Sequence, residues 1–85
     1  MTRKLLILCR SLTYAQRAAR TLSRAGIGAG VLRAPQGLSP SGCSYCVRIS
    51  EKSLEETLRR LEKAGIPYGK IFAQTGQGHY EEVMS

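Results

Sequence analysis

The sequence predicts an α+β fold in which a four-stranded antiparallel sheet carries two helices on one face, in the order βαββαβ. Short apolar segments of strand length alternate with two segments whose apolar residues have helical spacing. The tripeptide Ala25-Gly26-Ile27 also recurs as Ala64-Gly65-Ile66, and each copy follows one of the helix-like segments. Two strand–helix–strand halves of this kind pack in the ferredoxin-like arrangement, which places the first and third strands in the centre.

The first half is predicted to contain a strand, a helix and a second strand. Residues 4–9 are a continuous apolar run of strand length. Either Ser11 or Thr13 can cap the helix that follows, and its buried face is formed by Ala15, Ala18, Ala19 and Leu22. The second strand is expected over residues 27–33, although Gly28 and Gly30 weaken it.

The second half repeats this order after a loop over residues 34–42 that is rich in Pro and Gly. A third strand is expected over residues 44–49. The next helix is capped by Ser50 or Ser53, and its apolar stripe consists of Leu54, Leu58 and Leu61. A fourth strand over residues 68–73 completes a single domain over residues 1–73, and residues 74–85 are expected to form a flexible tail.

The composition is that of a small globular protein. The chain has 85 residues, of which 42% are hydrophobic, enough for one modest core. Its N-terminal apolar run is interrupted by Arg10 and is too short for a signal peptide or a membrane span. Three cysteines are an odd number, and reducing conditions disfavour structural disulfides. We therefore expect a cytoplasmic protein that does not contact a membrane.

The excess of basic over acidic residues is concentrated in the first half of the chain. The net charge is +7, and no acidic residue precedes Glu51. A one-sided basic surface favours an anionic partner, such as an acidic protein face or RNA, although a solvated helix face would have the same composition. The candidate partner-binding residues are Arg10, Arg17, Arg20 and Arg24.

The predicted topology brings the three thiols to one end of the sheet. Cys9 ends the first strand, and Cys43 and Cys46 lie at the start of the third, which is its antiparallel neighbour. The first helix also begins at this end. A helix N-terminus carries partial positive charge and lowers the pKa of a nearby thiol, and Arg10 and Arg48 would add to that effect.

Cys43-Ser44-Tyr45-Cys46 has the Cys-x-x-Cys form, which is compatible with several chemistries. A redox dithiol requires the strand to start at or after Cys46, because in an extended strand residues three apart lie ~10 Å apart. A structural zinc site needs four ligands, usually in two pairs, whereas the sequence offers one pair, the separate Cys9, and His79 in the expected tail. The third possibility is a single nucleophilic Cys43, with Cys46 resolving or structural. The alternative to all three is that these cysteines are small buried apolar residues without a chemical role. We expect no metal and no cofactor.

The order of these features resembles the family of small selenium/sulfur carrier-like domains. The matching features are the two Leu-x-x-Ala-Gly-Ile helix ends and the Pro/Ser-rich loop that leads into the cysteine-bearing strand, within residues 4–73. The family typically has Cys-Gly where this chain has Cys43-Ser44, and Cys46 is an addition. The resemblance implies that Cys43 carries sulfur or selenium as a persulfide or selenopersulfide. The implied partner is a protein that donates or accepts the carried atom.

Functions of other classes remain open on the sequence alone. Ferredoxin-like sheets can bind RNA through aromatic residues, but the third strand offers only Tyr45, so nucleic acid is the less favoured partner. A regulatory or dimerisation module is a further alternative. An uncovered sheet face would favour a homodimer. Whether the chain is an enzyme stays undecided, because fold alone does not determine function.

Overall fold

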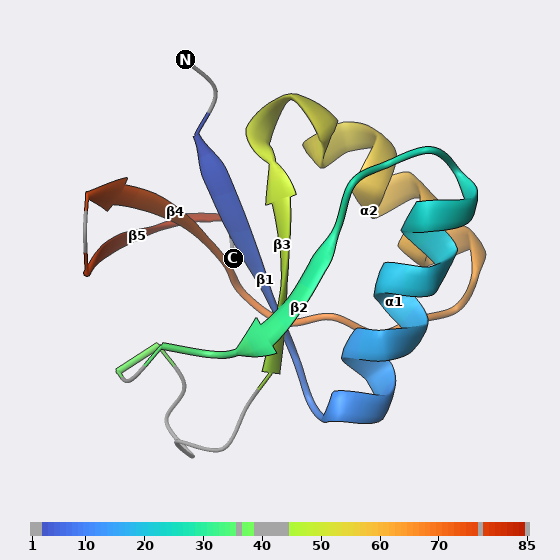
Figure 1. Cartoon of the computed structure of the whole chain (residues 1–85), viewed down its shortest axis with the longest axis horizontal. Coiled ribbons are helices and arrows are strands. Elements are labelled where there is room, and N and C mark those ends of the chain that lie inside the picture. The colour runs from blue at the N-terminus through green and yellow to red at the C-terminus, as the bar shows by residue number, and fades with distance from the viewer. Residues whose placement is uncertain (1–2, 36, 39–44, 77, 85) are drawn as a thin grey trace.

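The protein is an α+β structure with two α-helices and one five-stranded antiparallel sheet (Figure 1). The computed structural model describes residues 3–35, 37–38, 45–76 and 78–84. The elements in chain order are β1 (Lys4–Cys9), α1 (Leu12–Arg24), β2 (Gly30–Arg33), β3 (Tyr45–Ser50), the short 3-10 helix η1 (Glu51–Ser53), α2 (Leu54–Lys63), β4 (Ile71–Gly76) and β5 (His79–Met84). The strands lie in the order β2-β3-β1-β4-β5. The predicted α+β class, with two helices and an antiparallel sheet, is confirmed.

The prediction of four strands is wrong, because the segment expected to be part of a flexible tail contains a fifth. β5 pairs with β4 in antiparallel register from Ile71 opposite Met84 to Gly76 opposite His79. Gly78, in the connection between the two strands, has a φ of +77°, a conformation that glycine adopts without steric cost. A tight hairpin therefore adds an edge strand outside β4, and in Figure 1 it extends away from the two helices.

β1 and β3 are antiparallel neighbours, as expected for the first and third strands. Their register places Leu8 opposite Cys46 and Cys9 opposite Tyr45. On its other side β1 pairs with β4, and the backbone contact continues beyond that strand, since the Gly69 N–H donates to the Leu8 carbonyl at 2.8 Å. β1 is therefore held from both sides along its length.

Both helices end in the same backbone motif, which explains the repeated tripeptide. The N–H of Ile27 donates to the Leu22 carbonyl at 2.9 Å, and that of Ile66 donates to the Leu61 carbonyl at 3.0 Å. Gly26 lies between the members of the first pair with a φ of +80°. These are Schellman caps, in which an apolar residue after the glycine packs back on the helix. At the other end of α1, the Tyr14 N–H donates to Ser11 Oγ, so Ser11 is the N-cap.

Apolar side chains are buried on both faces of the sheet. Both helices pack on one face against Leu5, Ile7, Val47 and Ile49 (Figure 1). On the other face Leu6, Leu8 and Cys46 are buried, and Leu32, Ala34, Leu38, Phe72 and Tyr80 pack around them. We call this second group the outer cluster. The homodimer that the sequence predicted from an uncovered sheet face stays a prediction.

Candidate functional site

The residue predicted to be the nucleophile, Cys43, lies outside the described residues, as does the predicted turn before it. The structure does describe the strands on either side of that position, the other two cysteines and the start of α1. These surroundings define the scaffold that the loop enters. They also determine what Cys9 and Cys46 can do chemically.

Cys9 and Cys46 lie at the same end of the sheet but on opposite faces. In the β1–β3 pair Cys46 is opposite Leu8, and Cys9 is opposite Tyr45, one residue further along β1. Because successive side chains in a strand point to opposite faces, Cys9 enters the core under the helices and Cys46 enters the outer cluster. The expected convergence at one end is therefore met for these two thiols, but the sheet separates them.

Neither of these thiols is available to a partner protein in the folded chain. Cys9 is 3% exposed, and its Sγ lies 3.7 Å from the Ile7 carbonyl oxygen, to which the thiol donates a hydrogen bond. Cys46 is 0% exposed. Both are free cysteines. A donor's sulfur atom could reach either thiol only if the local structure opened.

Burial also suppresses the ionisation of both thiols. Desolvation raises the pKa of Cys9 from 9.0 to about 11. The pKa of Cys46 is likewise raised from 9.0 to about 11, chiefly by desolvation and further by the proximity of Cys9, while the Arg48 charge acts in the opposite direction. Since the thiolate is the nucleophile, both thiols are poor nucleophiles at neutral pH.

A hollow of about 360 Å³ lies beside the cysteine-bearing end of β1. It is lined by residues from the end of β1, from the loop after β2 and from the segment before β4, including Cys9, Arg10, Leu38, Tyr68 and Lys70. Arg10 therefore lies at this hollow. The other predicted arginines, Arg17, Arg20 and Arg24, line two different hollows between α1 and α2, and Arg10 lines neither of them. The four predicted partner-binding residues do not form one group.

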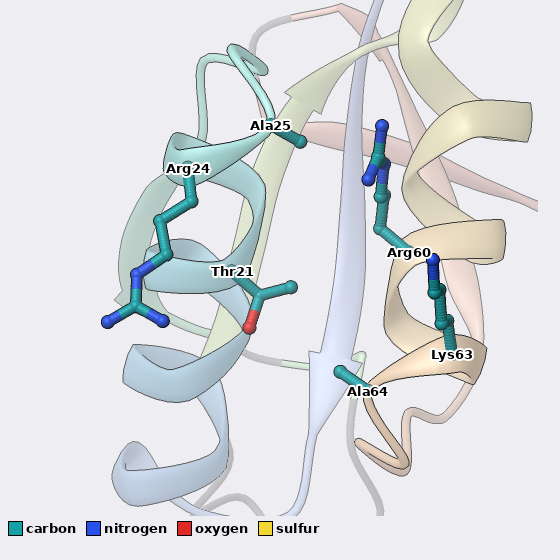
Figure 2. A pocket seen from close by; sticks show the side chains of 6 residues that line it. All are labelled: Thr21, Arg24, Ala25, Arg60, Lys63 and Ala64. Atoms are coloured by element: carbon teal, nitrogen blue, oxygen red, sulfur yellow. The ribbon is translucent and has the colours of Figure 1, made fainter.

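Arg17, Arg20 and Arg24 line a groove between α1 and α2, which we call the basic groove. Figure 2 shows one part of it, in which the Arg24 side chain on α1 points away from α2. Two adjoining hollows form the groove, one of about 320 Å³ and one of about 220 Å³. α1 contributes Arg17, Arg20 and Arg24, and α2 contributes Arg60 and Lys63. The two α2 residues were not predicted as site residues, because mixed charges on that helix gave no one-sided signal in the sequence. Only the packing of the two helices reveals them.

Within the described ranges, neither helix has the length and apolarity that crossing a membrane would require. No curated protein matches this chain. The model of one protein family, described as "putative Se/S carrier protein-like", matches residues 4–73, which include every element from β1 to α2 and the first part of β4. The resemblance found in the sequence is thereby confirmed. This chain belongs to the putative Se/S carrier protein-like family.

Proposed function

We propose that the protein is a sulfur or selenium carrier and that Cys43 is the acceptor thiol. The Cys43 thiolate would attack the outer sulfur of a donor persulfide, R–S–SH. One S–S bond forms at Cys43 while the donor's S–S bond breaks and R–S⁻ leaves, so the exchange needs no external oxidant. A donor selenopersulfide would transfer selenium by the same exchange. Attack by an acceptor's thiolate on the outer atom would then pass it on.

The observation that carries this proposal is the burial of the other two thiols. A carrier needs a thiol that a partner's sulfur can reach and that ionises near neutral pH. Cys9 and Cys46 are 3% and 0% exposed, and the pKa of each is raised to about 11. Cys43 is the one remaining cysteine of the three in the sequence. Family membership supports sulfur or selenium as the cargo, and the burial of the other two thiols supports Cys43 as the acceptor.

The same data favour a structural role for Cys46 over a resolving one. A resolving thiol must reach the persulfide on its neighbour, whereas Cys46 is packed in the outer cluster among Leu6 and Leu8. Its position opposite Leu8 in the β1–β3 pair fixes the backbone there in extended form. We therefore propose that Cys46 fills space in the sheet as a small apolar residue, a common role for buried free cysteine.

Two further features complete the proposed mechanism. α1 begins at the end of the sheet where Cys9 lies, and no acidic residue occupies its first turn, so its positive end is unopposed there. We propose that this end lowers the pKa of Cys43. The carrier must also keep Cys43 reduced between transfers, for which a cytoplasmic location is appropriate.

Loading with a low-molecular-weight persulfide tests the proposal. Wild type, Cys43→Ser, Cys46→Ala and Cys9→Ala would each be incubated with the persulfide, desalted and treated with dithiothreitol. The sulfide released per chain measures the bound outer sulfur. We expect equal release from wild type, Cys46→Ala and Cys9→Ala, and none from Cys43→Ser. Undiminished loading of a folded Cys43→Ser protein would overturn the assignment.

A further inference from the structure

We propose that the basic groove between α1 and α2 binds an acidic helical segment of a partner protein. The inference rests on the proposed function only in naming that partner as the donor or acceptor of the carried atom. The groove itself is defined by its shape, its charge and the spacing of its residues, none of which involves a cysteine. It therefore makes a binding prediction that can be tested separately from sulfur loading.

The two hollows between the helices form one continuous groove, because they have wall residues in common. Both are lined by Thr21, Arg24 and Ala64. Figure 2 shows Thr21 on α1 and Arg60 and Lys63 on α2 on either side of the gap between the helices. Small side chains at Thr21, Ala25 and Ala64 leave this part of the groove open.

The lining of the groove is basic on both walls and includes no acidic residue among its described members. α1 has no Asp or Glu between its first and last residue. On α2, Glu56 forms ion pairs with Arg59 and Arg60, the latter at 2.6 Å. Glu62 instead accepts a hydrogen bond from the Tyr68 hydroxyl at 3.0 Å. The remaining excess of positive charge is exposed to solvent, and an acidic ligand would complement it.

The spacing of the arginines on α1 is better matched by an acidic helix as the ligand than by an irregular polyanion. Arg17, Arg20 and Arg24 lie at positions i, i+3 and i+7 of α1, so they form one row about 10 Å long at a rise of ~1.5 Å per residue. Carboxylates with the same spacing on a partner helix would face them in register. The three cations on α1 are all arginines, whose planar guanidinium can bind a carboxylate through two hydrogen bonds.

The groove lacks the feature that single-stranded nucleic acid would require. Bases bind through stacking on aromatic side chains, and the described lining of both hollows contains none. An acidic protein helix needs only the charges and the open floor that the groove provides. We therefore favour the protein segment as the occupant and treat RNA as an outcome of the test.

The test measures binding of a labelled helical peptide with glutamates at i, i+3 and i+7, by fluorescence anisotropy at low and high salt. The test variant is Arg20→Glu/Lys63→Glu, which changes one residue on each wall. The matched control is Arg48→Glu/Lys52→Glu, which makes the same change in charge at a hollow elsewhere on the molecule. Each double variant lowers the net charge from +7 to +3, since each reversal removes two units.

We expect the test variant to bind the peptide at least about tenfold more weakly than wild type, and the control to bind within about twofold of it. Binding should also weaken as salt rises. Equal losses of peptide affinity in both variants would mean that binding depends only on the net charge of the protein, and would overturn the proposal. Tighter binding of single-stranded oligouridine than of the peptide would also overturn it. Persulfide loading from a small-molecule donor should be unchanged in the test variant, and Cys43→Ser should bind the peptide normally. The groove and the carrier chemistry can thus fail independently.

Discussion

Raising the pH should destabilise the fold through the two buried thiols. Cys9 and Cys46 are neutral in the folded state, and the pKa of each is raised from 9.0 to about 11. The unfolded chain releases these protons above pH 9, whereas the folded chain retains them until about pH 11. The stabilisation is therefore complete below pH 9 and is lost as the pH rises through 11.

The size of this effect follows from the two-unit difference in pKa. At pH 11 the unfolded thiol is almost fully ionised and the folded thiol is half ionised, which lowers the free energy of unfolding by about 2 kcal/mol per thiol. The two thiols together account for about 4 kcal/mol. A small domain is stable by only roughly 5 to 15 kcal/mol, so the wild-type protein should lose much of its stability.

Urea unfolding at pH 8 and at pH 11 measures this loss. The matched control is the double variant Cys9→Ala/Cys46→Ala, which retains all tyrosines and lysines and therefore shares every other alkaline titration. Its lost side-chain packing lowers stability equally at both pH values, so it drops out of the comparison. We expect the wild type to lose about 4 kcal/mol more than the variant between the two pH values. Equal losses would refute the argument that burial suppresses ionisation of these thiols.

Three other perturbations have expected outcomes. Thr57→Val should raise the free energy of unfolding by about 1 kcal/mol in urea titrations, because Thr57 is 0% exposed and its hydroxyl has no hydrogen-bond partner among the described residues. Gly65→Ala should lower it by about 1 kcal/mol, because Gly65 has a φ of +70° and an added Cβ would contact nothing that offsets the strain. Truncation after Gly76 removes β5 and with it Tyr80, which packs against the outer cluster; alkylation of Cys46 should become faster, and an unchanged rate would mean that β5 does not protect it.

The elements with strong local signals were predictable from the sequence. The strand over residues 4–9 has the bounds of β1, and the Ala-Gly-Ile repeats end both helices because a glycine at positive φ closes each Schellman cap. β5 was missed because Tyr80, Glu81 and Glu82 read as a polar tail. The hairpin signal was the glycine pair Gly76 and Gly78 between two segments of strand length.

The candidate site was only partly predictable, because it depends on register and packing. The sequence places Cys9 and Cys46 at one end of the sheet, but only the pairing of Cys9 with Tyr45 shows that the two thiols are on opposite faces. Similarly, helical spacing identifies the arginine row on α1. The contributions of Arg60 and Lys63 to the same groove depend on how α2 packs beside α1, which no local pattern encodes.

Peptide-resolved mass spectrometry after persulfide loading tests the central claim most directly. The folded protein would be loaded with a low-molecular-weight persulfide at neutral pH, alkylated, unfolded, alkylated with a second reagent and digested. We predict that the peptide containing Cys43 carries one additional sulfur atom beneath the first alkyl group, and that Cys9 carries only the second reagent. Cys46, which can share a peptide with Cys43, would be assigned by fragmentation and should also carry only the second reagent. Additional sulfur on Cys9 or Cys46, or equal first-reagent labelling of all three cysteines, would contradict the account.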